Sequence, residues 1–137
     1  MAHWLFKTEP SEYSYADLAR DKRVVWEGIS NATALIHLRA VKRGDTVIVY
    51  HSGKDKAAVG LAEVTRGAYA DPKLGDAKRV VVDLKPVLPF ARPVLLSDFR
   101  SDPLLKTTEL VRITRLSVMP LTPAHHARVL ERGGVRA

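Results

Sequence analysis

The sequence has 137 residues and contains no cysteine. This absence excludes disulfide bonds, zinc knuckles and a thiol nucleophile. No apolar run approaches the roughly 20 residues that span a bilayer. The first residues bring a charge, Lys7, and a proline, Pro10, after only a short apolar stretch, which is unlike a signal peptide. We therefore expect a soluble, intracellular protein located in the cytoplasm.

Signatures of catalysis are also missing. There is no Gly-x-Ser-x-Gly elbow, no Walker sequence and no Gly-x-Gly-x-x-Gly run. His51 and Ser52 are neighbours on a predicted strand and so point to opposite faces. His125 and His126 are adjacent on a predicted helix, about 100° apart, which favours a solvated helix face over a metal site. The sequence predicts a binding protein rather than an enzyme, with no catalytic residue, cofactor or metal.

The composition is that of a globular domain with a basic surface. Hydrophobic residues make up 46% and charged residues 27% of the chain, and its length fits one domain over residues 1–137. Lys and Arg number 22 against 15 Asp and Glu, a formal net charge of +7. Such an excess attracts polyanions such as nucleic acid, although charge alone fits a merely solvated basic surface equally well.

Hydrophobic periodicity and turn residues predict a mixed fold. Ser14, with Asp17 three residues later, is typical of a capped helix start, and Thr122 followed by Pro123 is another. The remaining pattern predicts strands over 3–7, 23–26, 46–51, 58–65 and 79–87, a further extended segment over 112–118, helices over 31–41 and 122–132, and single helical turns over 96–100 and 107–110. These strands are too closely spaced for repeated β-α-β crossovers. We expect an α+β fold with a strongly curved or barrel-like sheet.

Trp4 and Trp26 are the only tryptophans, and each lies in a short predicted strand close to polar residues. A tryptophan in a strand is usually part of the core. A tryptophan that instead walls a pocket stacks a nucleic-acid base with about 1–3 kcal/mol, while polar groups such as Asn31 or Ser52 read the base edge.

Six motifs occur in order along almost the whole chain. They are Trp4-Leu5-Phe6-Lys7-Thr8-Glu9-Pro10-Ser11-Glu12-Tyr13-Ser14, Trp26-Glu27-Gly28-Ile29-Ser30-Asn31-Ala32, Gly44-Asp45 with Val49-Tyr50-His51-Ser52, Val59-Gly60, Ala68-Tyr69-Ala70-Asp71, and Arg115-Leu116-Ser117-Val118-Met119-Pro120. Together they resemble the EVE domain family of the PUA-like group. The resemblance implies a curved sheet flanked by short helices, similar to the YTH domains that hold a methylated base in an aromatic pocket.

The resemblance also implies one base-binding pocket. Its predicted rim consists of Lys7, Thr8, Glu9, Ser11, Trp26, Asn31, Tyr50, His51 and Ser52. Trp26 is the expected stacking wall, whereas Trp4 is expected in the core. Glu9 and Asn31 have competing roles as caps of the helices that follow them. Phosphate contacts are assigned to two basic groups, one formed by Arg39, Lys42 and Arg43 and the other by Lys54 and Lys56.

Three functions remain open at this point. The first is a module that recognises a modified base, such as a modified cytosine in DNA. The second is a PUA-like RNA-binding protein that reads RNA shape and phosphates, and the third is an enzyme acting on a nucleoside or a small acid. A nuclease or an RNA-modification protein is a conceivable partner, no membrane is expected to be one, and the sequence does not define the oligomeric state.

Overall fold

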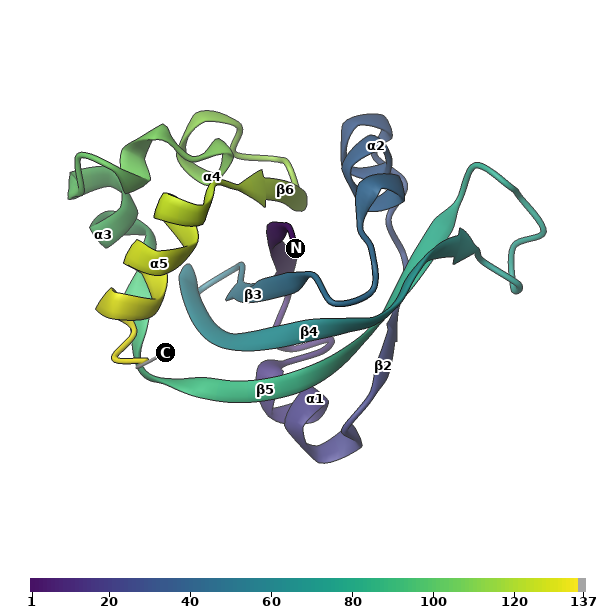
Figure 1. Cartoon of the computed structure of the whole chain (residues 1–137), viewed down its shortest axis with the longest axis horizontal. Coiled ribbons are helices and arrows are strands. Elements are labelled where there is room, and N and C mark those ends of the chain that lie inside the picture. Colours follow the sequence, from purple (N-terminus) through teal and green to yellow (C-terminus); the bar gives the residue numbers. More distant parts are fainter. Residues whose placement is uncertain (136–137) are drawn as a thin grey trace.

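The centre of the molecule is one strongly curved sheet, shown in Figure 1 in the computed structural model, which describes residues 1–135. Among those residues it has six strands in the order β2-β5-β4-β3-β1-β6. The strands are β1 (His3–Thr8), β2 (Val24–Trp26), β3 (Thr46–His51), β4 (Ala57–Ala70), β5 (Val80–Leu95) and β6 (Val118–Leu121). The first strand is parallel to β3 and antiparallel to β6, and β3 pairs with β4 as predicted. The expected α+β fold with a curved sheet is confirmed.

The long hairpin of β4 and β5 produces the curvature. Its ladder shifts register at several points, including the steps between Ala58 and Gly60 and between Arg66 and Tyr69. Such bulges bend a strand and increase its twist. The predictions ended these strands too early, at Thr65 and Val87. Both strands continue because bulges lie close to the prolines of β5, and a proline is tolerated in a strand at such irregularities.

Five α-helices and one 3-10 turn surround the sheet in the described part of the chain. They are α1 (Tyr15–Asp21), α2 (Ala32–Ala40), α3 (Leu96–Ser101), η1 (Leu105–Thr107), α4 (Glu109–Arg112) and α5 (Pro123–Arg132). The predicted caps are confirmed: Ser14 and Asp17 form a capping box, Asn31 caps α2 and Thr122 caps α5. Figure 1 shows α1 beneath the sheet and α3, α4 and α5 grouped at one end of it.

Trp4 belongs to the core, as predicted, with 6% of its surface exposed. Its indole Nε1 donates to Asp45 Oδ2 at 2.9 Å. The same carboxylate accepts from the backbone N–H groups of Ala2 and Lys42, at 3.0 and 2.9 Å. Burial raises the pKa of Asp45, but these three hydrogen bonds outweigh it and hold the pKa below its ordinary value. Asp45 thereby joins the start of β1 to the turn after α2.

The segment before α5 differs from its prediction. The strand expected over residues 112–118 is present only as β6, which begins at Val118 and continues through Pro120. As β6 is an edge strand of the described sheet, it tolerates a residue without an N–H, such as Pro120.

A buried carboxylate holds α5 in place. Asp102, fully buried after α3, accepts from Arg128 at 3.0 Å and from Arg132 at 2.8 Å, which fixes α5 against the segment that follows α3.

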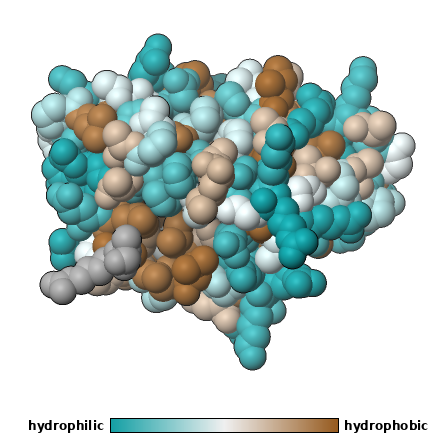
Figure 2. Space-filling view, viewed as in Figure 1, coloured by the Kyte–Doolittle hydropathy of each residue, from teal (hydrophilic) through white to brown (hydrophobic). Residues whose placement is uncertain are grey.

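The face of the molecule drawn in Figure 2 is mostly polar, with a group of hydrophobic atoms near the C-terminal end. None of the helices within residues 1–135 is long and apolar enough to cross a membrane.

Candidate functional site

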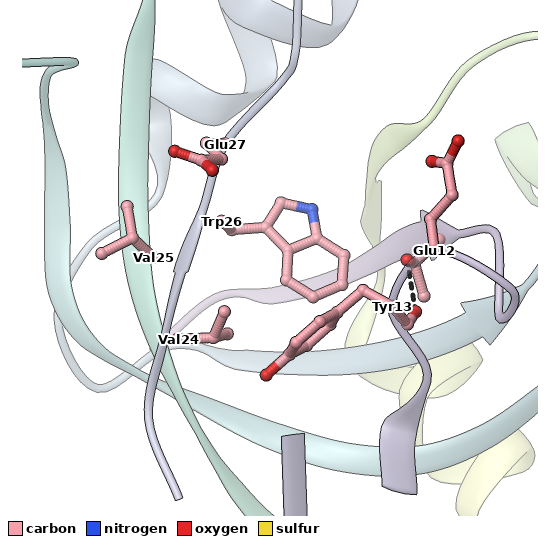
Figure 3. Close-up of a pocket in the computed structure, with 7 residues that line it drawn as sticks. Glu12, Tyr13, Val24, Val25, Trp26 and Glu27 are labelled. Atoms are coloured by element: carbon pink, nitrogen blue, oxygen red, sulfur yellow. Dashed lines mark hydrogen bonds between the residues drawn. The ribbon is translucent and has the colours of Figure 1, made fainter. Parts of the chain in front are cut away.

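A pocket of about 420 Å³ lies between β2 and the loop that joins β1 to α1. This volume falls within the roughly 300–1,000 Å³ typical of small-ligand sites. Trp26 and Tyr13 form aromatic walls, and the full lining is Thr8, Glu12, Tyr13, Val24, Val25, Trp26 and Glu27 (Figure 3). Val24 and Trp26 reach the same side because they are two positions apart on one strand.

Trp26 is fixed by its neighbours but keeps one polar atom free. Its ring centroid lies 5.7 Å from that of Phe6 and 6.4 Å from that of Tyr13, and Tyr13 meets it edge to face at 87°. Only 7% of Trp26 is exposed. Its Nε1–H, unlike that of Trp4, has no hydrogen-bond acceptor within residues 1–135, and Figure 3 shows this nitrogen on the side of the ring where Glu12 and Glu27 lie. A bound ligand can therefore accept a hydrogen bond there.

The loop that carries Tyr13 is held by its own backbone. The carbonyl of Glu9 accepts from the N–H groups of Glu12 and Tyr13, each at 2.9 Å. Thr8 Oγ1 donates to the carbonyl of Tyr13 at 2.7 Å, and the Tyr13 hydroxyl donates to Asp21 at 3.0 Å. Burial, and then this bond to Asp21, raises the pKa of Tyr13 to about 12. Tyr13 is thus a neutral, positioned wall at ordinary pH.

Two of the nine predicted rim residues, Thr8 and Trp26, line this pocket. The other seven are absent from its lining, so the structure does not bring the predicted set into one rim. The physical reason is local, because most of these side chains are committed to contacts of their own. The seven predicted residues outside the lining are Lys7, Glu9, Ser11, Asn31, Tyr50, His51 and Ser52.

At the end of β1, Lys7 Nζ donates to the carbonyl of Thr114 at 2.8 Å and lies 5.9 Å from the ring centre of Tyr50. Burial lowers the pKa of Lys7 and raises that of Tyr50. Glu9 Oε1 accepts from the N–H and the hydroxyl of Ser11, at 3.3 and 3.2 Å. Glu9 therefore does not cap α1, a role that belongs to Ser14.

The remaining three residues have structural contacts. Asn31 Oδ1 accepts from the N–H of Ala34 at 3.0 Å, which is the capping role weighed for it. His51 is buried, and its Nε2 accepts from the N–H of Tyr15 at 3.0 Å. The backbone N–H of Ser52 donates to the carbonyl of Thr8 at 2.9 Å and ties the ends of β1 and β3 together.

The two basic groups predicted for phosphates lie far from each other in the fold. Arg39, Lys42 and Arg43 are exposed on and just after α2. Lys54 and Lys56 line a shallow hollow together with Arg100 of α3. Figure 1 shows α2 close to the far end of the β4–β5 hairpin, and α3 at the opposite side of the molecule.

Five pocket residues were not predicted, namely Glu12, Tyr13, Val24, Val25 and Glu27. A signal for some of them was available in the sequence. Val24 shares a strand face with Trp26 by the two-residue period, and Tyr13 is an aromatic residue directly before a helix cap. The contact of the loop with β2 is tertiary, and the sequence pattern carries no sign of it.

The expectation of a solvated face for the two adjacent histidines is wrong. His125 is buried with its Nε2 2.8 Å from Thr107 Oγ1, and His126 stacks on His3 with ring centroids 4.0 Å apart. Burial, and then the charge of His3, lowers the pKa of His126 to about 4. No group of three or more metal-ligating side chains occurs in the part of the chain that the structure describes.

The open curved sheet, the short helices around it and the aromatic pocket at one edge define a PUA-like α+β domain. The chain belongs to the EVE domain family, whose model matches residues 2–132. The resemblance inferred from the six sequence motifs is confirmed.

Similarity to individual proteins extends over most of the chain. Thymocyte nuclear protein 1 of Gallus gallus is 30% identical in an alignment 154 positions long, which covers 88% of this chain and 64% of that protein. The NMR structure of Rpa0253 from Rhodopseudomonas palustris is 38% identical, with a TM-score of 0.93 and coverage of 98% of this chain and 94% of that one. Human thymocyte nuclear protein 1, in complex with 5-methylcytosine-containing DNA, is 29% identical with a TM-score of 0.88 and full coverage of both chains.

Proposed function

We propose that this domain binds nucleic acid and holds a modified base, such as 5-methylcytosine in DNA, in the pocket that Trp26 and Tyr13 line. The observation that carries the proposal is the free Nε1–H of the buried Trp26 inside an aromatic pocket of about 420 Å³. The similarity to the human relative in complex with 5-methylcytosine-containing DNA supports the same ligand class.

The pocket has the properties that a single base requires. Trp26 and Tyr13 offer aromatic surface, and stacking on such surface contributes about 1–3 kcal/mol per base. The free indole N–H suits a ring nitrogen or carbonyl oxygen, and the carboxylates of Glu12 and Glu27 near the opening suit an exocyclic amino group. A base reaches such a pocket from a duplex only after it has left the stack, at a cost of a few kcal/mol.

The proposed role is binding rather than catalysis. In support, Nε2 of His51 accepts from the backbone N–H of Tyr15 and so does not act as a general base. His125 and His126 are taken up by packing around Thr107 and His3. A nuclease or an RNA-modification protein as partner, and a cytoplasmic location, stay predictions, and the names of the vertebrate relatives call those proteins nuclear.

A net charge of +7 favours contacts with phosphates but does not decide which cations make them. Two basic groups are exposed and are the candidates for these contacts, namely Arg39, Lys42 and Arg43, and Lys54 and Lys56. Their positions relative to the pocket distinguish the two groups. Neutralising each phosphate releases counterions, so the affinity falls as salt rises.

The test compares three oligonucleotides of one sequence: a DNA duplex with a single 5-methylcytosine, the unmodified duplex, and the corresponding RNA. Affinities are measured at about 50 mM and about 200 mM salt. We expect tighter binding of the methylated duplex at both salt concentrations. Equal affinity for both duplexes, with RNA bound more tightly and binding lost at high salt, would instead support an RNA-binding protein that reads shape and phosphates.

A further inference from the structure

Four exposed cations from two separate segments lie where α2 meets the loop of the β4–β5 hairpin. Arg39 lies on α2, Lys42 and Arg43 lie in the turn after it, and Lys78 lies in the loop between β4 and β5. We call these four residues the arm cluster, because the β4–β5 hairpin extends like an arm beside α2 in Figure 1.

Hydrogen bonds and close backbone packing hold the arm cluster together. Arg39 Nη2 donates to the carbonyl of Lys78 at 2.9 Å, which joins α2 to the hairpin loop. A Cβ added to Gly67 of β4 would lie 3.1 Å from the carbonyl oxygen of Val41 and 3.4 Å from the N of Arg43. This glycine lets β4 approach the turn after α2 closely, and that approach sets the hairpin beside the turn that carries Lys42 and Arg43.

The charge of the arm cluster is not neutralised by the protein. None of its four members forms an ion pair with a carboxylate within residues 1–135. Nearby acids are engaged elsewhere: Asp45 is buried, Glu63 pairs with Lys85 at 3.1 Å, and Asp76 accepts from the backbone N–H of Lys78 at 2.9 Å. Arg66 of β4 is not a member, because its guanidinium lies 3.6 Å from the ring centre of Tyr69 and its cross-strand partner is the acidic residue Asp83.

The hairpin loop also contacts the strand that carries the pocket. Lys73 Nζ lies 3.3 Å from Glu27 Oε2 at the pocket rim, and Arg79 Nε donates to the carbonyl of Ile29 at 3.0 Å. A path over the protein surface therefore leads from Trp26 along the loop to the arm cluster. The second basic group has a different position: Lys54 and Lys56 share their hollow with α3, which Figure 1 shows at the opposite side of the molecule.

We propose that the arm cluster binds the phosphodiester backbone next to the base held in the Trp26 pocket, and that Lys54, Lys56 and Arg100 lie off this path. The proposal deepens the proposed function and rests on it. It adds Lys78 to the phosphate-binding residues and removes the second basic group from them. Cations in this arrangement contribute affinity that depends on salt but carry no preference for one base over another.

The test uses two double variants that remove the same charge and the same residue types. The arm variant is Lys42→Gln with Arg43→Gln, and the matched control is Lys54→Gln with Arg100→Gln. Affinity for a duplex with one 5-methylcytosine is measured across a salt series. In the arm variant we expect the slope of log affinity against log salt to become shallower by about 1 to 2, since each lost phosphate contact removes about 0.9. The control variant should keep the slope of the unaltered protein.

Two outcomes overturn the proposal: an unchanged slope in the arm variant, or an equal or larger loss in the control. The ratio of affinities for methylated and unmodified duplex should be the same in the arm variant as in the unaltered protein. A ratio of one in the unaltered protein contradicts the proposed function but not the phosphate path. A ratio above one in the unaltered protein, together with an unchanged slope in the arm variant, contradicts only the path.

A single substitution replaces the arm variant if melting shows that it is unfolded. This substitution is the exposed change Lys78→Gln, with Lys54→Gln as its control, and the expected change in slope is about 0.9.

Discussion

The backbone N–H of Tyr15 donates to Nε2 of His51 across 3.0 Å, which joins the first turn of α1 to the end of β3. The acceptor nitrogen carries no proton, so the proton of the neutral ring is on Nδ1, 3.2 Å from Asp55. The Tyr15 hydroxyl donates to the carbonyl of Leu61 at 2.7 Å. One tyrosine thus links α1 to both β3 and β4, and α1 follows directly on the loop that carries Tyr13.

His51→Ala should destabilise the protein by about 1–3 kcal/mol, because it leaves the buried N–H of Tyr15 without an acceptor. His51→Gln, whose side-chain oxygen can reach the same N–H, should recover part of the loss. Urea denaturation of the two variants measures the difference. Equal stability of both variants and the unaltered protein would show that the hydrogen bond contributes nothing.

Gly60→Ala should also destabilise the protein, by about 1–3 kcal/mol, since the new methyl group would overlap the ring of Tyr15 at 2.5 Å. The backbone conformation at this position does not itself require glycine, so the effect reports the packing of α1 on β4. In the background of Tyr15→Leu, which removes the ring, the same change should cost much less. A double-mutant cycle by thermal melting gives the coupling, and strictly additive effects would contradict the overlap.

The stacked pair of His3 and His126 predicts a loss of stability in mild acid. The pKa of His126 lies at about 4 in the folded protein and near 6.5 when unfolded. Between these values the unfolded chain binds the extra proton, so the contribution of His126 to stability is complete above pH 6.5 and is lost as the pH drops toward 4. His126→Phe keeps an aromatic partner for His3 and removes the titration.

The free energy of unfolding of His126→Phe should therefore depend less steeply on pH between 6.5 and 4 than that of the unaltered protein. His3 and His125 have pKa values shifted in the same direction by burial, so a smaller dependence remains in the variant. Identical pH profiles of the two proteins would rule out a depressed pKa at His126.

Asn31 offers a way to separate capping from base recognition. Asn31→Ala should cost about 0.5–2 kcal/mol of stability through the lost cap of α2. Asn31→Asp keeps a capping oxygen but removes the amide N–H donors. As the pocket lining does not include Asn31, the ratio of affinities for methylated and unmodified duplex should be the same in the Asp variant. A loss of that preference without a loss of stability would assign Asn31 to the ligand after all.

Local features of the fold could be predicted from the sequence. Ser14, Asn31 and Thr122 fix helix starts because a cap acts through its own neighbours, within three residues. The full length of the β4–β5 hairpin could not be predicted, since its bulges arise from pairing between distant segments. The same limit applies to His126, whose burial depends on the docking of His3 from the other end of the chain.

The candidate site shows the same division. Trp26 and Thr8 could be predicted from the resemblance, but the pocket that they line is completed by Tyr13 and Glu12 from a loop whose position depends on tertiary packing. His51 looked equally polar in the sequence, and only the structure reveals that its acceptor nitrogen is used by a backbone N–H.

The most direct test of the account is the affinity of Trp26 variants for a duplex that carries one 5-methylcytosine. Because Trp26 is buried against Phe6, alanine would open a cavity, so the informative variants are Trp26→Leu, which keeps apolar volume, and Trp26→Phe, which keeps an aromatic ring. Melting identifies any variant that fails to fold. We predict that Trp26→Leu binds at least about tenfold more weakly, as expected for the loss of a base stack, and that Trp26→Phe retains most of the affinity. A folded Trp26→Leu variant that binds the methylated duplex as tightly as the unaltered protein would contradict the account.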